Sequence, residues 1–260
     1  MSTKSYHISA VLLIRDEGEY LPEWLEWHLG HGIEHVFIYD DSRKAPIAGF
    51  LGEYAPYCTV MDATRYHYHL QLESYVDALR RFGNKTEWMA FIDTDEFLRV
   101  TDGRTLPEVL SEFPLAAAVL VPWTVYNADG QIRKKPGLVR ERFHQTVPWL
   151  KGMPSWKSVV RPEFVISMAA HHPEKMQDGA FMVDTNGTKR DRDFSDLPAD
   201  KLVVDHYYTK SYEEWLARLP KGSCDPFSSR KMEWFEALNP GLLSSAGLTT
   251  GELPQKLNSK

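Results

Sequence analysis

The residues of this chain best suited to chemistry are three carboxylates within four positions, Asp93, Asp95 and Glu96. They end an apolar run beginning at Trp88, whose β-branched and aromatic residues predict a buried strand. Buried charge is costly unless it is paired or bound to a metal. Asp93 and Asp95 are two positions apart, so an extended backbone would direct both to one side, where they could bind Mg²⁺ or Mn²⁺. The alternative is an ordinary solvated acidic turn.

The chain has 260 residues and a formal net charge of −6, with 43% hydrophobic and 25% charged residues. This composition predicts a globular protein of one large domain or two small ones, and it argues against a nucleic-acid partner. Aromatic residues make up 12%, including eight Trp, which is compatible with stacking on sugars, although core packing explains most of them. Two cysteines provide neither a disulfide framework nor a zinc site. The N-terminal residues lack a signal-peptide pattern and no run has the length of a membrane span, so we expect a cytoplasmic protein.

Strand-like and helix-like segments alternate through the first half of the chain. The expected strands are 8–14, 35–39, 59–61, 117–121 and one that begins at Trp88 and ends at the acidic residues from Asp93 on. The expected helices begin near Leu21, Leu72 and Thr105. This alternation predicts an α/β fold with a mainly parallel sheet, in which ligands bind beyond the carboxyl ends of the strands. Three of those ends carry polar groups: Arg15-Asp16-Glu17, Asp40-Asp41-Ser42 and Asp93-Thr94-Asp95.

The second half is less regular. We expect strands at 156–160, 164–168 and 202–204, helices at 212–219 and 228–238, and a polar loop from about 173 to 200. The chain contains neither Gly-x-Gly-x-x-Gly nor a Walker sequence, which disfavours a dinucleotide-binding fold and a P-loop NTPase.

Four segments together resemble the motifs of one enzyme family. They are Arg15-Asp16-Glu17-Gly18 with Tyr20 to His28, Ile38-Tyr39-Asp40-Asp41-Ser42, Phe91-Ile92-Asp93-Thr94-Asp95-Glu96-Phe97-Leu98, and Asp205-His206-Tyr207-x-Thr209-Lys210-Ser211. The chain is similar, over about residues 8–220, to family 2-like glycosyltransferases and the related family 92. The resemblance implies a GT-A fold, in which a Rossmann-like sheet is flanked by helices and followed by a mixed acceptor-side half. It also implies inverting transfer of a sugar from a nucleotide-diphosphate donor with Mn²⁺ or Mg²⁺.

The same resemblance implies a domain division. A single GT-A domain would span 1–245, with a nucleotide-sugar-binding half at 1–125 and an acceptor-side half at 126–245. Residues 246–260 are mostly small and polar, and this composition predicts a mobile tail. The acceptor would be a carbohydrate or a lipid-linked acceptor, which is compatible with peripheral association with a membrane.

Roles for individual residues follow from the resemblance. Asp93 and Asp95 would be the DxD pair that holds the metal, His206 a third ligand, and His172 its reserve. His206 could instead only pack or cap a strand end. The residues expected to bind the nucleotide sugar are Arg15, Glu17, Asp40, Asp41, Gln71, Asp93, Thr94, Lys157 and Lys210. For Lys157 and Lys210, the alternative is a solvated surface lysine.

The catalytic base is the least defined part of the site. An inverting transfer needs a carboxylate to take the acceptor proton, and the candidates are Glu141, Glu174 and Asp178, each of which could equally be a surface residue. The family's Trp-x-x-Phe-Gly-x-x-Gly is present only as the divergent segment from Trp123 to Gly130. His67-Tyr68-His69 could form a second metal site, although a loop beside the sugar is favoured.

Two other classes of function share these features. A nucleotidyltransferase or metal-dependent phosphohydrolase would also use an acidic strand end, but it would release pyrophosphate or phosphate. A catalytically silent protein that only binds sugar nucleotides would carry a degenerate site, which the three intact polar strand ends argue against.

Overall fold

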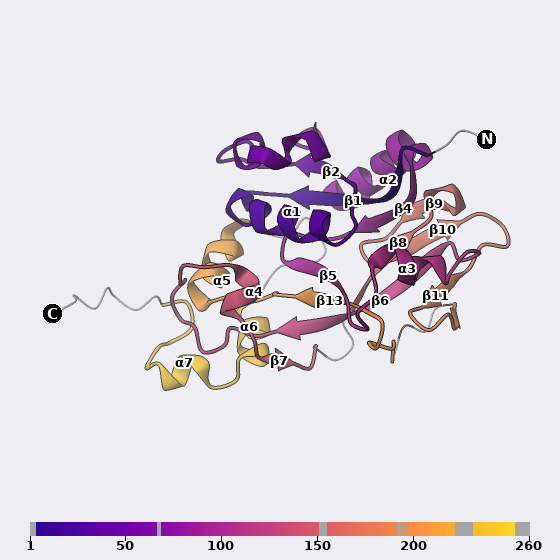
Figure 1. Ribbon diagram of the computed structural model, residues 1–260. Coiled ribbons are helices and arrows are strands. Elements are labelled where there is room, and N and C mark those ends of the chain that lie inside the picture. The colour runs from indigo at the N-terminus through magenta and orange to yellow at the C-terminus, as the bar shows by residue number, and fades with distance from the viewer. Residues whose placement is uncertain are drawn as a thin grey trace. The chain divides into compact units, whose positions relative to one another are not determined.

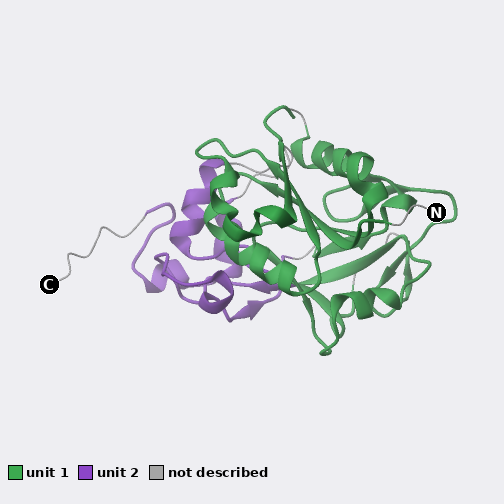
Figure 2. Ribbon diagram, turned by 45° about the horizontal axis from the view of Figure 1, so that its top comes forward, with its two compact units in different colours: residues 1–123, 154–205 green, residues 124–153, 206–260 purple. Residues whose placement is uncertain are grey.

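The computed structural model describes residues 4–66, 69–150, 155–191, 194, 196–221 and 231–252. Figure 2 shows the two compact units of the chain, Met1–Trp123 with Pro154–Asp205, and Thr124–Met153 with His206–Lys260. The chain leaves the first unit close to the predicted division at 125. It then returns, so the units do not follow the contiguous halves 1–125 and 126–245, because later strands join the first sheet.

The first unit is built on a mixed sheet with the strand order β12-β11-β6-β8-β4-β1-β2-β3 (Figure 1). The strands are β1 (Tyr6–Ile14), β2 (His35–Asp40), β3 (Cys58–Asp62), β4 (Thr86–Phe91), β5 (Glu96–Val100), β6 (Ala118–Tyr126), β8 (Trp156–Val160), β11 (Met182–Asp184), β12 (Lys189–Arg190) and β13 (Leu202–His206). Strands β3, β2, β1 and β4 are parallel neighbours, and β11 is parallel to β6. The predicted α/β class with a mainly parallel sheet is therefore confirmed.

One strand reverses the direction of the sheet. β8 lies between β4 and β6 and is antiparallel to both. β13 pairs with β5 and β6 outside the main order. A separate two-stranded sheet joins β9 (Val165–Met168) to β10 (Pro173–Met176).

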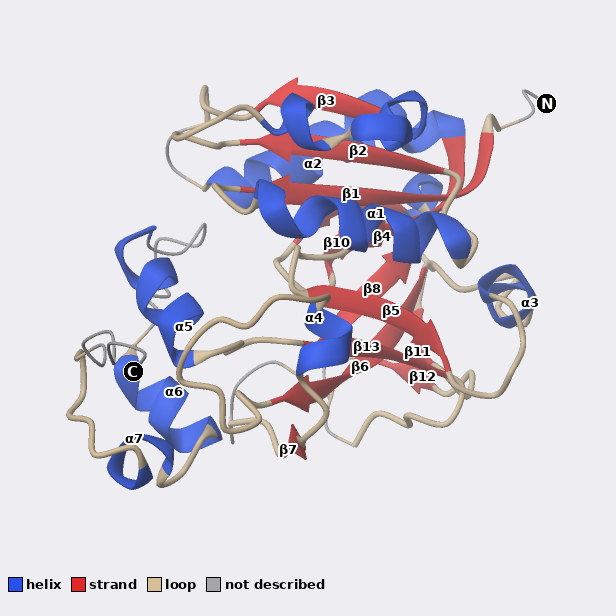
Figure 3. Cartoon of the chain, turned by 60° about the vertical axis from the view of Figure 1, so that its left-hand side comes forward, coloured by secondary structure: helices blue, strands red, loops and turns tan. Residues whose placement is uncertain are grey.

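The helices of the first unit begin where the sequence predicts. They are α1 (Leu21–Gly30), α2 (Leu70–Phe82) and α3 (Leu106–Ser111), with short 3-10 turns at Gly18–Tyr20, Ile47–Phe50, Gly52–Tyr57, Gly83–Lys85 and Pro162–Phe164. α1 has a proline in its first turn and buries Leu21, Trp24 and Leu25. α1 and α2 cover opposite faces of the sheet (Figure 3). No helix in the described ranges is both long and apolar enough to span a membrane.

The sheet register gathers three polar strand ends. Val11 of β1 lies opposite Phe37 of β2 and Phe91 of β4, and all three strands run in one direction. Their carboxyl ends therefore meet at one edge, which we call the polar edge.

Strands β5, β10, β11 and β12 were not predicted from the sequence. β10, β11 and β12 lie in the segment expected to be a polar loop, and they have four, three and two residues. Such short runs carry too little periodicity to be recognised. β5 starts at Glu96, in the acidic segment that was expected only to end a strand.

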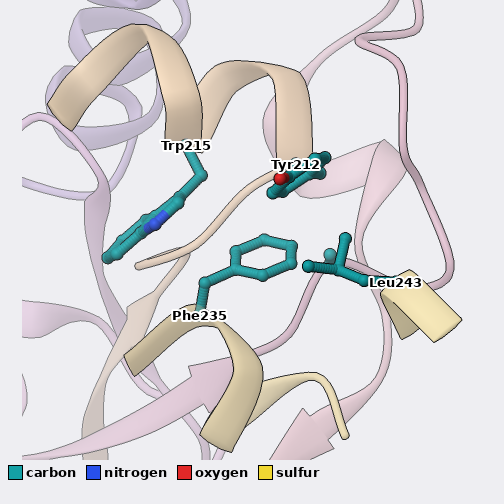
Figure 4. Packing of buried hydrophobic residues seen from close by; sticks show 5 residues of the cluster. Tyr212, Trp215, Phe235 and Leu243 are labelled. Atoms are coloured by element: carbon teal, nitrogen blue, oxygen red, sulfur yellow. The ribbon is translucent and has the colours of Figure 1, made fainter. Parts of the chain in front are cut away.

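The second unit is mainly helical. Its elements are α4 (Val139–Arg142), β7 (Thr146–Val147), α5 (Tyr212–Arg218), a 3-10 turn at Leu219–Lys221, α6 (Met232–Leu238) and α7 (Leu242–Ser245). Figure 4 shows their core, in which Tyr212, Trp215, Phe235 and Leu243 pack together with Ala128.

The described part of the predicted mobile tail is packed on this core. Leu248 contacts the cluster, and the Gly251 N–H donates to the Tyr212 hydroxyl at 2.7 Å. Residues 246–252 are therefore packed on the second unit, because Leu248 contacts the cluster just after α7. The mobility of the tail stays a prediction. The remainder of the predicted tail lies outside the described residues.

Two capping boxes give a matched test of local stability. Ser211 caps α5 through buried contacts with Glu214, whereas Thr105 caps α3 through exposed contacts with Glu108. We expect Ser211→Ala to lower the free energy of unfolding by about 1–2 kcal/mol and Thr105→Ala by about 0.5–1 kcal/mol. Urea unfolding of the two variants measures the difference, and a larger effect at Thr105 would contradict it.

Candidate active site

The acidic segment forms a tight turn between β4 and β5. The Glu96 N–H donates to the Asp93 carbonyl at 3.1 Å, and the Asp93 N–H donates to Glu96 Oε2 at 2.9 Å. Trp24 Nε1 of α1 donates to the same carbonyl at 2.9 Å. The extended backbone expected for Asp93 and Asp95 is therefore wrong, since the chain must reverse here to start β5.

The two aspartates differ in their exposure. The Asp93 side chain is 34% exposed, whereas Asp95 is 3% exposed as a residue. The turn thus presents one carboxylate to solvent and buries its neighbour. Glu96 is fully buried, and the ammonium of Lys157, 3.5 Å from its Oε2, offsets the cost of burying its carboxylate.

Lys157 is the cation of the acidic turn. It lies on β8, is 1% exposed, and donates from Nζ to Asp93 Oδ2 at 2.8 Å. Its Nζ lies 3.5 Å from Glu96 Oε2. Burial alone lowers the pKa of Lys157, but the carboxylates of Asp93 and Glu96 raise it well above its usual value, so the ammonium stays charged. The alternative of a solvated surface lysine is wrong.

A second charged group follows β1 and β2. Asp41 is fully buried and accepts from Arg15 Nε at 2.5 Å and from Arg43 at 2.6 Å. Asp41 therefore holds two arginines at the polar edge. Arg43 was not singled out in the sequence, and its position directly after Asp41-Ser42 was the available signal.

The two loops are also tied together through backbone groups. Asp16 has a left-handed backbone (φ 52°), and its Oδ1 accepts the N–H groups of Arg43 and Lys44, both at 2.8 Å. Asp40, expected to meet the nucleotide, accepts from Ser42 N at 2.9 Å and Ile47 N at 3.0 Å. Its contacts are thus those of a residue that shapes the loop.

Further contacts join the loops to the acidic turn. The Thr94 hydroxyl donates to Glu17, and both residues are buried. Gln71, in the first turn of α2, lies 3.5 Å from Asp93 Oδ1 through Nε2, which also donates to the Tyr75 hydroxyl at 2.9 Å. The structure therefore gathers at the polar edge Arg15, Glu17, Asp41, Gln71, Asp93, Thr94 and Lys157, and their role in binding the donor stays a prediction.

The histidine pair lies near Lys157. The Ala170 carbonyl is 3.5 Å from Lys157 Nζ, and His171 Nδ1 is 3.1 Å from the Trp156 carbonyl. Burial, together with the charge of Lys157, lowers the pKa of His171 to about 3, so its ring is neutral near pH 7. His172 packs its ring against Phe194, with ring centroids 4.7 Å apart.

The three predicted bases are all exposed. Glu174 lies on β10 and Asp178 on the turn after it, while Glu141 lies on α4 of the second unit. This solvated setting is that of ordinary surface carboxylates. The base role of these residues stays a prediction.

The remaining predicted residues belong to the second unit. His206 is buried against Trp149 and Tyr208, with ring centroids 5.9 and 5.3 Å away. Lys210 is 1% exposed and has a left-handed backbone (φ 50°), so it is not a solvated surface lysine. Their metal and phosphate roles stay predictions. His67 and Tyr68 lie outside the described residues.

The donor set of the acidic turn fits a hard cation. Within the described ranges, no three His, Cys, Asp or Glu side chains are grouped around one metal position. Mg²⁺ and Mn²⁺ are commonly bound by one or two carboxylates, with water and phosphate oxygens completing the shell. Asp93, 34% exposed at the polar edge, is a residue of that type, and Asp95, 3% exposed, follows two positions later in the same turn.

The chain is similar to known proteins of one family. The profile of glycosyltransferase family 92 matches residues 14–236. A glycosyltransferase family 92 protein of Oryza sativa subsp. japonica is 27% identical over 118 residues, which is 42% of this chain and 19% of that protein. A galactan β-1,4-galactosyltransferase of Arabidopsis thaliana is 29% identical over 121 residues, which is 43% of this chain and 23% of that protein.

These matches cover about a fifth of the length of the curated relatives. Among solved structures, mannosyl-3-phosphoglycerate synthase from Rubrobacter xylanophilus is 15% identical with a TM-score of 0.38, covering 72% of this chain and 67% of that chain. The family profile, in contrast, extends over most of the chain described above. The chain belongs to glycosyltransferase family 92.

Proposed function

We propose that this chain transfers a sugar, with inversion, from a nucleoside-diphosphate donor to a hydroxyl group of a carbohydrate acceptor. The observation that carries the proposal is the polar edge, where the ends of β4, β1 and β2 gather the acidic turn, Lys157 and two arginines. Membership of family 92 supports the reaction class, and a GT-A fold and a DxD function for the acidic turn are parts of the proposal.

The donor diphosphate would bind at the polar edge. Arg15 and Arg43 are held by the buried Asp41 and supply positive charge for phosphate oxygens. Glu17 is fixed by Thr94 and would accept a bond from the ribose or base. Asp93 and Asp95 would hold Mn²⁺ or Mg²⁺, which when bound supplies Lewis-acid neutralisation of the departing diphosphate.

Lys157 supports this arrangement from inside the fold. Its ammonium fixes Asp93 Oδ2, while Oδ1 of the same carboxylate lies 3.5 Å from Gln71 Nε2. The carboxylate is therefore held in one orientation before any ligand arrives, which lowers the cost of ordering it on binding. His206 and His172 remain candidates for an additional metal ligand.

A donor panel tests the proposal. The purified protein with Mn²⁺ is incubated with UDP- and GDP-sugars, and UDP-galactose comes first because of the similarity to a galactosyltransferase. We expect one donor to raise the melting temperature and to be hydrolysed slowly when no acceptor is present. No shift and no hydrolysis with any donor would contradict the proposal.

The products separate the competing activities. Glycosyl transfer or donor hydrolysis releases a nucleoside diphosphate, whereas a nucleotidyltransferase releases pyrophosphate and a phosphohydrolase releases phosphate. A thermal shift without any product would identify a protein that only binds sugar nucleotides.

A further inference from the structure

The second unit carries three half-buried aromatic side chains that come from separate parts of the chain. Trp149, Tyr208 and Trp234 are each partly exposed. The ring centroids of Trp149 and Tyr208 are 4.9 Å apart with an interplanar angle of 86°, and those of Tyr208 and Trp234 are 6.3 Å apart. We call these three residues, with His206 between Trp149 and Tyr208, the aromatic corner.

The aromatic corner is built on a rigid base. Tyr208 and Trp234 pack on the buried cluster of the second unit. Figure 4 shows Trp215 and Phe235 of that cluster. The Tyr208 carbonyl accepts from the buried Arg218 at 2.7 Å. The buried cluster therefore fixes the ring of Tyr208, and the hydrogen bond from Arg218 fixes its backbone. Part of the ring stays accessible to solvent.

The size of the aromatic corner limits what can bind there. A fully covered aromatic side chain buries about 150–250 Å², and these three are already half-buried. Covering the rest would bury roughly 300 Å², well below the about 800 Å² per partner of a stable protein interface. The aromatic corner is thus suited to a small ligand.

The chemistry of the aromatic corner favours a carbohydrate. Two rings at nearly a right angle offer two apolar walls, and sugar rings have apolar C–H faces bordered by hydroxyl groups. Tyr and Trp combine an apolar ring with a polar O–H or N–H, and His206 adds a hydrogen-bonding ring. None of the four side chains carries a permanent charge, so the aromatic corner is better suited to a neutral ligand than to a charged one.

We propose that the aromatic corner binds one or two units of a neutral carbohydrate acceptor. This inference rests on the proposed glycosyl transfer and extends it by assigning the acceptor class to named residues. It gives a role to Trp149, Tyr208 and Trp234, which the proposed donor chemistry does not use.

Binding of defined oligosaccharides tests the inference directly. Isothermal titration calorimetry of the full chain with β-1,4-galactotetraose, cellotetraose and maltotetraose identifies a ligand. Trp149→Ala is expected to weaken its binding about five- to tenfold, the loss expected for one aromatic contact. Trp149→Phe should restore most of the affinity, because it retains an aromatic wall.

Trp27→Ala is the matched control. Trp27 is also half-buried and stacks on His31, but it lies on α1 of the first unit. It should leave oligosaccharide affinity unchanged, and the melting temperature of every variant shows whether it is folded. Unchanged affinity in a folded Trp149→Ala protein, or no binding of any of the three oligosaccharides by the wild type, would overturn the inference.

Donor hydrolysis distinguishes this failure from that of the proposed function. Trp149→Ala should hydrolyse the donor at the wild-type rate, since water then replaces the acceptor. A wild-type protein that hydrolyses a donor but binds no oligosaccharide refutes the aromatic corner alone. A protein that acts on no donor refutes the proposed function, and the binding titration still decides the aromatic corner.

Discussion

Asp95→Asn is expected to abolish the thermal shift given by Mn²⁺ with the donor and to lower transfer at least about a hundredfold, because a neutral amide is a poor ligand for a hard cation. The substitution keeps the size of the side chain. Since Asp95 is 3% exposed, this conserved size should let the turn between β4 and β5 keep its fold. The measurement is a melting curve with and without Mn²⁺ and donor, followed by a rate measurement.

Asp102→Asn is the control for Asp95. Asp102 lies in the exposed loop after β5 and pairs with Arg104 at 2.6 Å. It should leave both the thermal shift and the rate unchanged. If the Asp95→Asn protein keeps the full Mn²⁺-dependent thermal shift, Asp95 is not a ligand of the metal.

Lys157→Met is expected to lower the free energy of unfolding by about 3–5 kcal/mol, the usual cost of breaking a buried ion pair from one side. The substitution removes the ammonium but leaves Glu96 fully buried and Asp93 without its 2.8 Å partner. Chemical denaturation measures the loss. Mn²⁺ binding to the folded fraction should also weaken, since Asp93 is no longer held in one orientation.

Lys201→Met is the control for Lys157→Met, because it removes a lysine from an ion pair that is partly exposed. Lys201 pairs with Glu112 at 2.7 Å, but its side chain is 27% exposed. An exposed pair contributes about 0–1 kcal/mol, so Lys201→Met should be nearly neutral. Equal losses in the two variants would show that burial of Lys157 is not what makes its ion pair important.

The first unit could be predicted well because its signals are local. Strand β1 is a continuous apolar run, α1 has Pro22 in its first turn, and the end of β4 is marked by Asp93. Parallel pairing then requires the ends of β1, β2 and β4 to meet, so the polar edge follows from alternation alone.

The role of Lys157 could not be predicted with the same certainty. It is an isolated lysine 64 positions from Asp93, and only the antiparallel insertion of β8 beside β4 brings the two together. Glu96 shows a related difficulty, since it begins a new strand and acts within the turn. Non-local pairing of this kind leaves no periodic pattern near either residue.

In the second unit, a local motif could be predicted from the sequence but a cluster of distant residues could not. The capping box at Ser211 and Glu214 was readable as a motif, and the structure contains it. The aromatic corner joins positions 149, 206, 208 and 234, which no spacing rule connects. Abundant tryptophan was visible in the sequence, but core packing and ligand binding give the same composition.

Calorimetric titration of UDP and of GDP into the wild-type protein, in Mn²⁺ and in EDTA, tests most directly whether the acidic turn binds a dication that recruits the donor diphosphate. We predict that one of the two nucleotides binds in Mn²⁺, that EDTA abolishes its binding, and that Asp95→Asn has the same effect as EDTA. Equal affinity in Mn²⁺ and EDTA, or no binding of either nucleotide, would contradict this account.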